Sequence, residues 1–343
     1  MTRRQDVAAA AKYGYVTFTL LAIASYLFSL PLAVYLLYTS KEGVEYSAAS
    51  IRPFFMIYMI AFQLPLSIKV GLLFPLLAAV FLTCFLASAR SGPSFRSIVD
   101  SVNERPLTYF FRNWLFAMPL VANTLLSAVV LLQSFQEAHG VPTGSISFPP
   151  NPFVAMISLS YASIVEEIGF RITPLGTVVL LYVLRNLPKG MGPAKMVKTM
   201  LISLASPERA KAEVQLPTIE SNGLRRGVSI YEWIAVFATS FIFGAAHYIF
   251  GGGWDVGKIS SAFLAGLVLG LVYVWRGAPA SILLHWFFNC YGYIYGVASN
   301  YHPALFPSIV DLIDNSVILF TALGLLIITA HVLNYLGGRG GTP

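Results

Sequence analysis

The run NPFVAMISLSYASIVEEIGFRITPLGTVVLLYVL, residues 151–184, decides the fold class. A helix needs about 20 apolar residues to cross a bilayer core of about 30 Å, and this run is longer than that. In its middle stand two adjacent carboxylates, Glu166 and Glu167, with Arg171 shortly after them. A charge near the centre of a bilayer costs at least about 2.5–3.5 kcal/mol, so these residues require either mutual compensation or a function.

The composition of the whole chain indicates a membrane protein. Of 343 residues, 57% are hydrophobic and 11% are charged, and the mean hydropathy is +0.71; a soluble domain carries about 25% charged residues. The net charge of +7 is spread along the segments between apolar runs, so it reflects topology and predicts no nucleic-acid partner. Cys84 and Cys290 both lie in apolar runs and provide neither a disulfide framework nor a metal-binding spacing.

Eight runs are long enough to cross a bilayer as helices. They cover residues 15–38, 69–89, 114–133, 152–172 (with 174–185 as a second piece), 229–250, 259–276, 278–298 and 313–336. They predict an all-α polytopic membrane protein of about eight transmembrane helices, with the site in the helix core. The run PFFMIYMIAFQLPL, residues 53–66, is short and bounded by prolines, which favours a half-helix or re-entrant piece over a full crossing.

The distribution of Lys and Arg sets the expected orientation. With the N-terminus inside, 17 of the 22 basic residues fall on inside segments, and this bias predicts that both termini are cytoplasmic. The polar insert 186–228 is then a cytoplasmic, partly amphipathic loop, with SPERAKAEVQ as a surface helix. We expect N-terminal transmembrane helices (1–150), a catalytic membrane core containing that loop (151–298), and a C-terminal helix (299–343) that ends in a disordered tail, GGRGGTP.

Helix geometry gives the charged residues of the quoted run different surroundings. Glu167 and Arg171 are four positions apart, share a helix face and can form an ion pair. Glu166 points about 100° away and has no such partner in its own helix. A buried ion cluster that joins helices explains Glu167 and Arg171 but not Glu166. We therefore interpret Glu167 as structural and Glu166 as free to act.

Two of the five histidines lie in apolar runs beside a second informative residue. His247 ends the motif FGAAH, which begins at Phe243, and His285 begins the motif HWFFN, which ends at Asn289. The two residues of each motif share a helix face, and an asparagine inside a span is costly unless it finds a partner. The other histidines are expected to be interfacial or solvated: His139, His302 and His331.

Glutamate, histidine and asparagine gathered in a dry site suit hydrolysis. A glutamate with a histidine can bind and deprotonate water, while a second histidine and an asparagine can donate hydrogen bonds to the oxyanion that forms. The sequence contains no GxSxG, Ser–Lys or HExxH pattern, so it offers no recognisable serine nucleophile or common zinc motif.

Three motifs in order on successive apolar segments, EExxxR (Glu166–Arg171), FxxxH (Phe243–His247) and HxxxN (His285–Asn289), resemble the CAAX-protease and bacteriocin-processing family of intramembrane glutamate endopeptidases. The resemblance covers about residues 152–298. It implies an eight-helix membrane core that needs no metal or other cofactor. It also implies site roles: Glu166 and His247 activate water, His285 and Asn289 form the oxyanion hole, and Glu167, Arg171 and Phe243 support the geometry.

The same resemblance implies a peptide or protein substrate that reaches the site from the membrane or cytoplasmic side, with prenylated CAAX-type peptides as one class. It implies a multi-pass protein of the cell membrane in a prokaryote, or of the endoplasmic reticulum membrane in a eukaryote. Two alternatives stay open. A zinc-dependent intramembrane protease would use Glu166, His247 and His285 as ligands. A non-catalytic transporter, scaffold or immunity protein would use its intramembrane charges in another way.

The expected topology creates a conflict of depth. His247 lies near the outer end of its span, whereas His285 lies only about ten residues from the inner face. A shared site therefore requires that the helix holding His247 starts deeper, or that the loop at Gly251–Gly253 dips into the membrane, which non-helical backbone can do only inside a protein cavity.

Overall fold

Helices dominate the protein. The computed structural model describes residues 3–337, without the side chains of residues 3–8, 331 and 334–337; the rest of the predicted disordered tail, residues 338–343, lies outside the described residues. The first half contains α1 (Arg3–Thr39), α2 (Lys41–Ser47), β1 (Ser50–Ile51), β2 (Phe54–Ile57), β3 (Ile60–Gln63), β4 (Ile68–Lys69), α3 (Val70–Ala89), α4 (Phe95–Asp100), α5 (Leu107–Phe110) and α6 (Trp114–Ala138).

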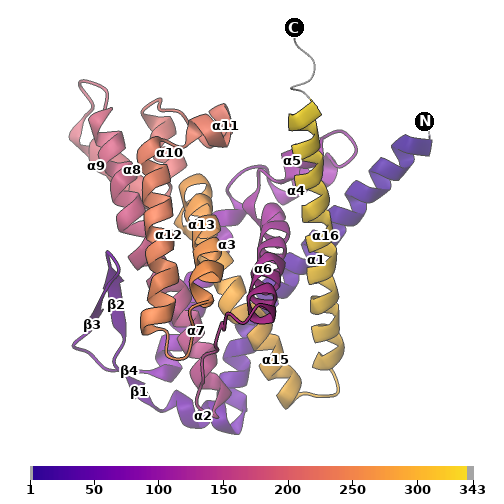
Figure 1. The fold of residues 1–343 in the computed structure, drawn as a ribbon, viewed down its shortest axis with the longest axis vertical. Helices are drawn as coiled ribbons and strands as arrows, with labels where there is room; N and C mark the ends of the chain where they lie inside the picture. Colours follow the sequence, from indigo (N-terminus) through magenta and orange to yellow (C-terminus); the bar gives the residue numbers. More distant parts are fainter. Residues whose placement is uncertain (1–2, 338–343) are drawn as a thin grey trace.

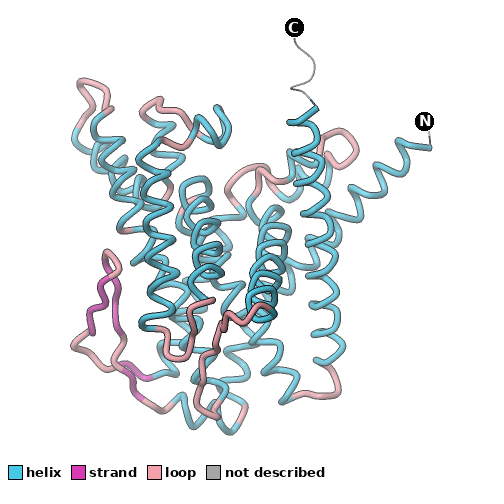
Figure 2. Tube along the Cα trace, in the orientation of Figure 1, coloured by secondary structure: helices cyan, strands magenta, loops and turns pink. Residues whose placement is uncertain are grey.

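The second half carries the predicted site on helices that two π-helical turns, η1 and η2, interrupt. Its elements are α7 (Pro152–Glu167), η1 (Ile168–Ile172), α8 (Pro174–Arg185), α9 (Pro193–Ala205), α10 (Pro207–Glu213), α11 (Ile219–Gly227), α12 (Ile230–Phe250), α13 (Lys258–Arg276), α14 (Ala278–Trp286), η2 (Phe287–Tyr291), α15 (Gly292–Tyr301) and α16 (Phe306–Gly337). Figure 2 shows the strands confined to one corner of a helical molecule.

Among residues 3–337, seven helices are long and apolar enough to cross a membrane. They are Ala9–Thr39, Val70–Ala89, Trp114–Ala138, Pro152–Arg185, Ile230–Phe250, Lys258–Arg276 and Phe306–Ala330. The predicted all-α membrane architecture is therefore confirmed. The eighth predicted span, 278–298, is not one regular helix, because it consists of α14, η2 and α15 in succession.

A shared hydrophobic core joins the N-terminal helices to those that carry the site. Trp286 of α14 is fully buried, and its ring lies 5.7 to 6.3 Å from the rings of Phe81, Phe85 and Tyr26 in α3 and α1. On the other side of the site, α12 and α13 pack so closely that a Cβ at Gly244 would overlap the carbonyl oxygen of Ile259. This close approach fixes the helix that holds His247 against its neighbour.

The segment 53–66, which was predicted to be a half-helix or a re-entrant piece, contains no helix and forms a β-hairpin. Strands β2 and β3 pair in antiparallel register, with Ile57 opposite Ile60 across the two-residue turn Tyr58–Met59. A short run in which only Gln63 is clearly polar carries little periodicity, so its aromatic and β-branched content should have favoured a strand. Tertiary contacts hold the turn: the Tyr58 amide donates to Thr173 Oγ1 at 2.9 Å, and the Met59 amide donates to the Gly169 carbonyl at 3.1 Å.

The polar insert 186–228 folds into three short helices, α9 to α11. The predicted surface helix in SPERAKAEVQ exists as α10, but its Lys211 is fully buried, so one of its faces packs inward. Figure 1 shows α9, α10 and α11 at the end of the molecule that also holds both termini. The three segments that were predicted to share the cytoplasmic side thus lie at one end, and the assignment of that end to the cytoplasm stays a prediction.

Candidate functional site

The carboxylate pair stands where α7 changes into a π-helical turn. Pro174 has no amide hydrogen and its ring excludes the carbonyl four residues earlier, so a regular α-helix cannot continue through it. The chain responds with η1, in which the Thr173 amide donates to the Ile168 carbonyl at 3.0 Å. The Thr173 hydroxyl bonds to the same carbonyl at 2.8 Å. Such π-bulges are frequent at functional sites, and this one follows directly after Glu166 and Glu167.

Glu167 is fully buried and its two oxygens accept hydrogen bonds from three side chains. Arg171 Nη1 lies 3.0 Å from Oε1, as the spacing predicts, and His285 Nδ1 lies 2.8 Å from the same oxygen. The Ser281 hydroxyl donates to Oε2. The carboxylate therefore connects α7 to α14, and its acceptor capacity is largely used in positioning those partners.

Glu166 has a different environment from its neighbour. Its side chain is 23% exposed, and its Oε2 lies 3.6 Å from Nε2 of His285. Within the described part of the chain, Oε2 is buried and has no hydrogen-bond partner. A carboxylate beside an imidazole, with an oxygen that no protein group satisfies, can bind and polarise a water molecule.

Phe243 brings the two histidines to one place. Its ring centroid lies 4.5 Å from that of His247 and 6.0 Å from that of His285. The Arg171 guanidinium carbon lies 4.3 Å from the same ring centroid, so Arg171 also makes a cation–π contact with Phe243. His247 Nδ1 lies 2.8 Å from the Phe243 carbonyl, so Nδ1 carries the hydrogen and Nε2 of a neutral ring is left as an acceptor.

Asn289 is the least connected of the predicted residues. It lies in η2, and its amide donates to the Leu159 carbonyl of α7 at a long 3.5 Å. Among residues 3–337 it forms no hydrogen bond with the other predicted site residues. The structure thus links Glu166, Glu167, Arg171, Phe243, His247 and His285 through direct contacts, whereas Asn289 approaches from the facing helix with its amide only weakly engaged.

The two predicted histidines do come together, because both rings contact Phe243, although α12 (Ile230–Phe250) has nearly the bounds of the predicted run 229–250. In Figure 1 the lower end of α12 and the loop that follows it lie above α2 and above the lower end of α15. His247 stands one turn before that end. The loop is held by backbone bonds to the segment before α7: Asp255 N donates to Thr143 O and Ser145 N to Gly253 O, each at 3.0 Å. The loop that follows His247 is therefore packed against the segment that precedes α7.

Sequence reasoning missed Ser281 and the two π-helical turns. Ser281 was detectable in principle, because it precedes His285 by four positions and so shares its helix face. The Thr173–Pro174 pair was a signal for η1. Residues 287–291 contain no proline or other signal that would have predicted η2.

The arrangement of donors bears on metal binding. Among residues 3–337, no group of three or more His, Cys, Asp or Glu side chains is arranged to hold a metal ion. The Nδ1 atoms of both His247 and His285 already bond to oxygen, so each ring could offer only Nε2.

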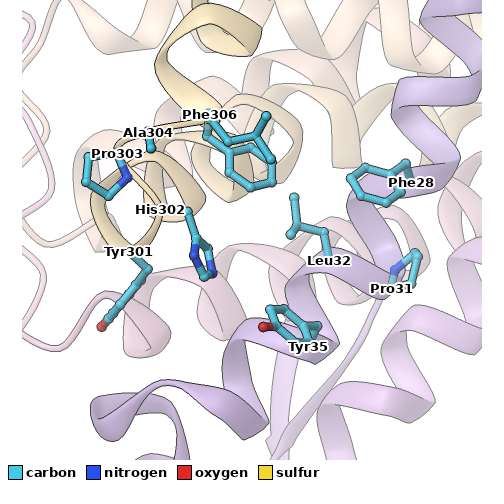
Figure 3. Close-up of a pocket in the computed structure, with 10 residues that line it drawn as sticks. Phe28, Pro31, Leu32, Tyr35, Tyr301, His302, Pro303, Ala304 and Phe306 are labelled. Carbon is cyan, nitrogen blue, oxygen red and sulfur yellow. The ribbon is translucent and has the colours of Figure 1, made fainter.

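An apolar cavity of about 690 Å³ lies elsewhere, between α1 and the junction of α15 with α16 (Figure 3). His302 lines it and stacks on the Tyr35 ring with centroids 6.2 Å apart. His302 and His139 are both exposed, as predicted, and the side chain of His331 lies outside the described residues. None of the predicted site residues lines this cavity.

Comparison with known proteins gives one match. Residues 148–291 match a family model described as type II CAAX prenyl endopeptidase Rce1-like. This range contains the three motifs and every residue of the cluster described above. Neither the curated proteins nor the solved structures that were searched contain a significant match to the chain.

Proposed function

We propose that the chain is a membrane protease that acts on a peptide or protein substrate, and that it is a glutamate-type endopeptidase. The match of residues 148–291 to the Rce1-like family of type II CAAX prenyl endopeptidases supports the activity. In this mechanism Glu166 deprotonates the attacking water. The observation that carries the proposal is the contrast between the two adjacent carboxylates, since Glu167 is saturated with donors while Glu166 Oε2 faces His285 without one.

The neighbouring side chains fit the remaining steps. His247, with its Nδ1 occupied by the Phe243 carbonyl, offers Nε2 as the second acceptor for the attacking water. His285, held at Nδ1 by Glu167, presents Nε2 on the Glu166 side, and in its imidazolium form this atom donates to the oxyanion. The weakly engaged amide of Asn289 supplies a second donor. The proton that Glu166 takes from water passes to the leaving amine.

Burial strengthens each of these interactions, because charges act over a lower effective dielectric away from water. Arg171 and Ser281 hold the Glu167 carboxyl group in place, and Glu167 in turn holds His285 in one orientation. Fixed donors of this kind need no rearrangement when charge develops on the substrate carbonyl.

The substrate class is tested with purified protein in detergent. We expect cleavage of a farnesylated CAAX-type peptide, of its unprenylated counterpart, or of both, detected by mass spectrometry of the products. Glu166→Gln keeps the shape and removes the base, so the rate should fall by about 10²–10⁴-fold. The matched control is Glu104→Gln, because Glu104 is exposed and is not one of the predicted site residues; this variant should cleave normally.

Two results would contradict the mechanism. One is substantial turnover by a folded Glu166→Gln variant. The other is loss of wild-type activity in 1,10-phenanthroline with recovery on adding zinc, which would indicate a metalloprotease.

The side of approach is a further part of the proposal. The basic segment 186–228 shares one end of the molecule with both termini, which supports approach of the substrate from the cytoplasmic leaflet (Figure 1). Labelling of single cysteines in this segment in sealed vesicles would contradict this if the segment reacts only from the extracytoplasmic side.

A further inference from the structure

A cavity of about 600 Å³ lies at the end of the molecule that holds α10 and α11 (Figure 1). Its wall is built from the last turn of α3, the first residue of α6, the junction of α13 with α14, and parts of α10 and α11. None of the predicted site residues lines it. The cavity is therefore separate from the site around Glu166.

Side chains with unpaired hydrogen-bonding atoms gather in this cavity. Within residues 3–337, five of the twelve buried side-chain atoms that lack a partner belong to its lining. Four of the five can donate a hydrogen bond: Oγ of Ser88, Nε1 of Trp114, Nε1 of Trp275 and Nε of Arg276. The Trp114 residue is 0% exposed and the Arg276 side chain is 5% exposed. Because an unpaired buried donor is costly, this lining favours a ligand that accepts hydrogen bonds.

The lining is also rich in positive charge. Three arginines belong to it: Arg90, Arg209 and Arg276. Arg276 is held in place, because its Nη1 donates to Glu220 Oε1 and its Nη2 to the Phe111 carbonyl, each at 3.0 Å. Its guanidinium carbon also lies 4.1 Å from the centroid of the Trp275 ring. The unpaired Nε of Arg276 is therefore a positioned, charged donor.

Two carboxyl groups of the lining, those of Glu208 and Glu220, have cations beside them. Glu220 pairs with Arg276, and Glu208 Oε2 lies 3.7 Å from Nζ of Lys211. Glu208 Oε1 accepts a hydrogen bond from the Glu220 amide at 2.8 Å. Burial raises the pKa of the Glu208 carboxyl, which favours its neutral form and reduces its repulsion of an anion. Three arginines and two glutamates leave the lining with a formal charge of +1.

The depth of the cavity indicates the source of an anion. Three candidate spans have an end at its wall: Val70–Ala89 ends there, Trp114–Ala138 begins there, and Lys258–Arg276 ends there. The cavity therefore lies where the hydrocarbon core gives way to the head groups. Tryptophan is common at this level, and basic pockets between helices near it bind the phosphate-bearing head groups of lipids.

We propose that this cavity binds a phosphate group, with Arg276 Nε and the indole N–H groups of Trp114 and Trp275 as donors. Phosphate oxygens accept several hydrogen bonds at once, and arginine binds them with both charge and directed N–H groups. The phosphate belongs either to a phospholipid head group or to soluble phosphate, and the experiments below separate the two sources. This site does not depend on the mechanism proposed for Glu166, since the two share no residue.

A bound phosphate would join three helices. Its donors come from α3, α6 and α13, and α14 begins two residues after Arg276. The ligand binds the folded state, in which these donors are brought together, so it stabilises that state by mass action. Binding is therefore measurable as a rise in melting temperature with ligand concentration, whether or not the protein is cleaving a peptide.

The first experiment identifies the source of the phosphate. Purified protein, stripped of lipid in a neutral detergent, is titrated with inorganic phosphate, with phosphatidylglycerol, or with diacylglycerol of the same acyl chains. We expect a saturable rise in melting temperature with a phosphate-bearing ligand and none with diacylglycerol. A response to phosphatidylglycerol but not to inorganic phosphate assigns the site to a lipid head group, whereas a response to inorganic phosphate shows that the soluble ion suffices. No saturable response to either would overturn the proposal.

The second experiment removes one donor. Trp275→Phe keeps an aromatic ring beside Arg276 and deletes the indole N–H, so the apparent Kd of the ligand that binds should rise about 10–100-fold, as for the loss of one hydrogen bond to a charged group. Trp254→Phe is the matched control, because Nε1 of Trp254 is also buried and unpaired within residues 3–337 but lies outside the cavity. Equal Kd values for the two variants would overturn the proposal.

The third experiment removes one cation without altering the buried lining. Arg90 is exposed at the rim, so Arg90→Gln should raise the apparent Kd a few-fold, and the difference from wild type should shrink as the salt concentration rises. Arg96→Gln is the control, because the Arg96 side chain is 92% exposed and does not line the cavity. If Arg96→Gln weakens binding as much as Arg90→Gln, the phosphate binds the basic surface in general and the proposal is wrong.

Discussion

The protein contains two clusters of buried charged side chains, one around Lys211 and one around Glu167. In the first cluster, Lys211 of α10 is fully buried and donates to the Gly227 carbonyl at 2.7 Å and to Glu232 at 3.0 Å. Its Nζ also lies 3.7 Å from Glu208. Glu232 in turn accepts from the Ser229 amide and completes a capping box at the start of α12.

The site cluster has a saturated part of the same kind, Glu167 with Arg171, Ser281 and His285, but adds Glu166 beside it. The Lys211 cluster joins α10, α11 and α12. A buried ion pair is therefore weak evidence for function. Glu208 Oε2 also lacks a hydrogen-bond partner, but its charged neighbour is Lys211 at 3.7 Å. Glu166 Oε2 instead lies 3.6 Å from a histidine, which can take part in proton transfer, and this neighbour distinguishes the two clusters.

The largest expected effects come from breaking each cluster at its central charge. Lys211→Met strands Glu232, and Glu167→Gln strands Arg171, and each should lower the free energy of unfolding by about 3–5 kcal/mol, as for removal of one partner of a buried pair. Thermal melting in detergent measures the loss. Only Glu167→Gln should also lower turnover per folded molecule. Reduced turnover by folded Lys211→Met would remove the distinction between the clusters.

Asn289→Ala should lower kcat by about 10²–10³-fold, equivalent to about 2.7–4 kcal/mol, with KM changed only a few-fold, because an oxyanion donor acts in the transition state. Asn289→Asp should be at least as impaired, since a carboxylate repels the oxyanion. The matched control is Asn123→Ala in α6, where the amide bonds to the Pro119 carbonyl at 2.6 Å. A normal kcat per folded Asn289→Ala molecule would mean that Asn289 only joins η2 to α7.

A smaller effect is expected from the serines that complete each cluster. Ser281→Ala removes one donor from the buried Glu167 carboxylate and should cost about 1.5–3 kcal/mol of stability, with slower turnover because Glu167 positions His285. Ser229→Ala removes the α12 cap and should cost about 0.5–2 kcal/mol with turnover intact. Equal turnover in the two variants would show that Ser281 has no part in positioning.

The smallest effect concerns Glu208, at the margin of the Lys211 cluster. Burial raises the pKa of its carboxyl above the ordinary value of about 4.3. A carboxyl with a raised folded pKa contributes stability that is complete below the unfolded pKa and is lost as the pH rises through the folded pKa. Glu208→Gln should therefore match wild type near pH 4 and be more stable at pH 7, by less than about 1 kcal/mol because the group is partly solvated. Melting temperatures across this range test it, and a less stable variant at pH 7 would contradict it.

The sequence by itself determined what depends on local covalent geometry and on hydrophobicity. Long apolar runs can only be spans, because every backbone group in lipid must be satisfied within a helix or a closed barrel. The Glu167–Arg171 pair followed from the pitch of the helix, and so did the separate direction of Glu166. The family resemblance was readable because its three motifs lie within such runs.

Only the tertiary structure decided which surfaces meet. His285 reaches Glu167 across 118 positions of sequence, and no local pattern encodes that bond. The segment 53–66 became a hairpin because Gly169 and Thr173 supply the bonds that its turn requires, and a nearly continuous apolar run does not choose between helix and strand. Lys211 can be buried because Glu232 and the Gly227 carbonyl, which lie on other elements, accept hydrogen bonds from its ammonium group. In each case the deciding free energy comes from partners far along the chain, which a reading of the neighbouring residues does not contain.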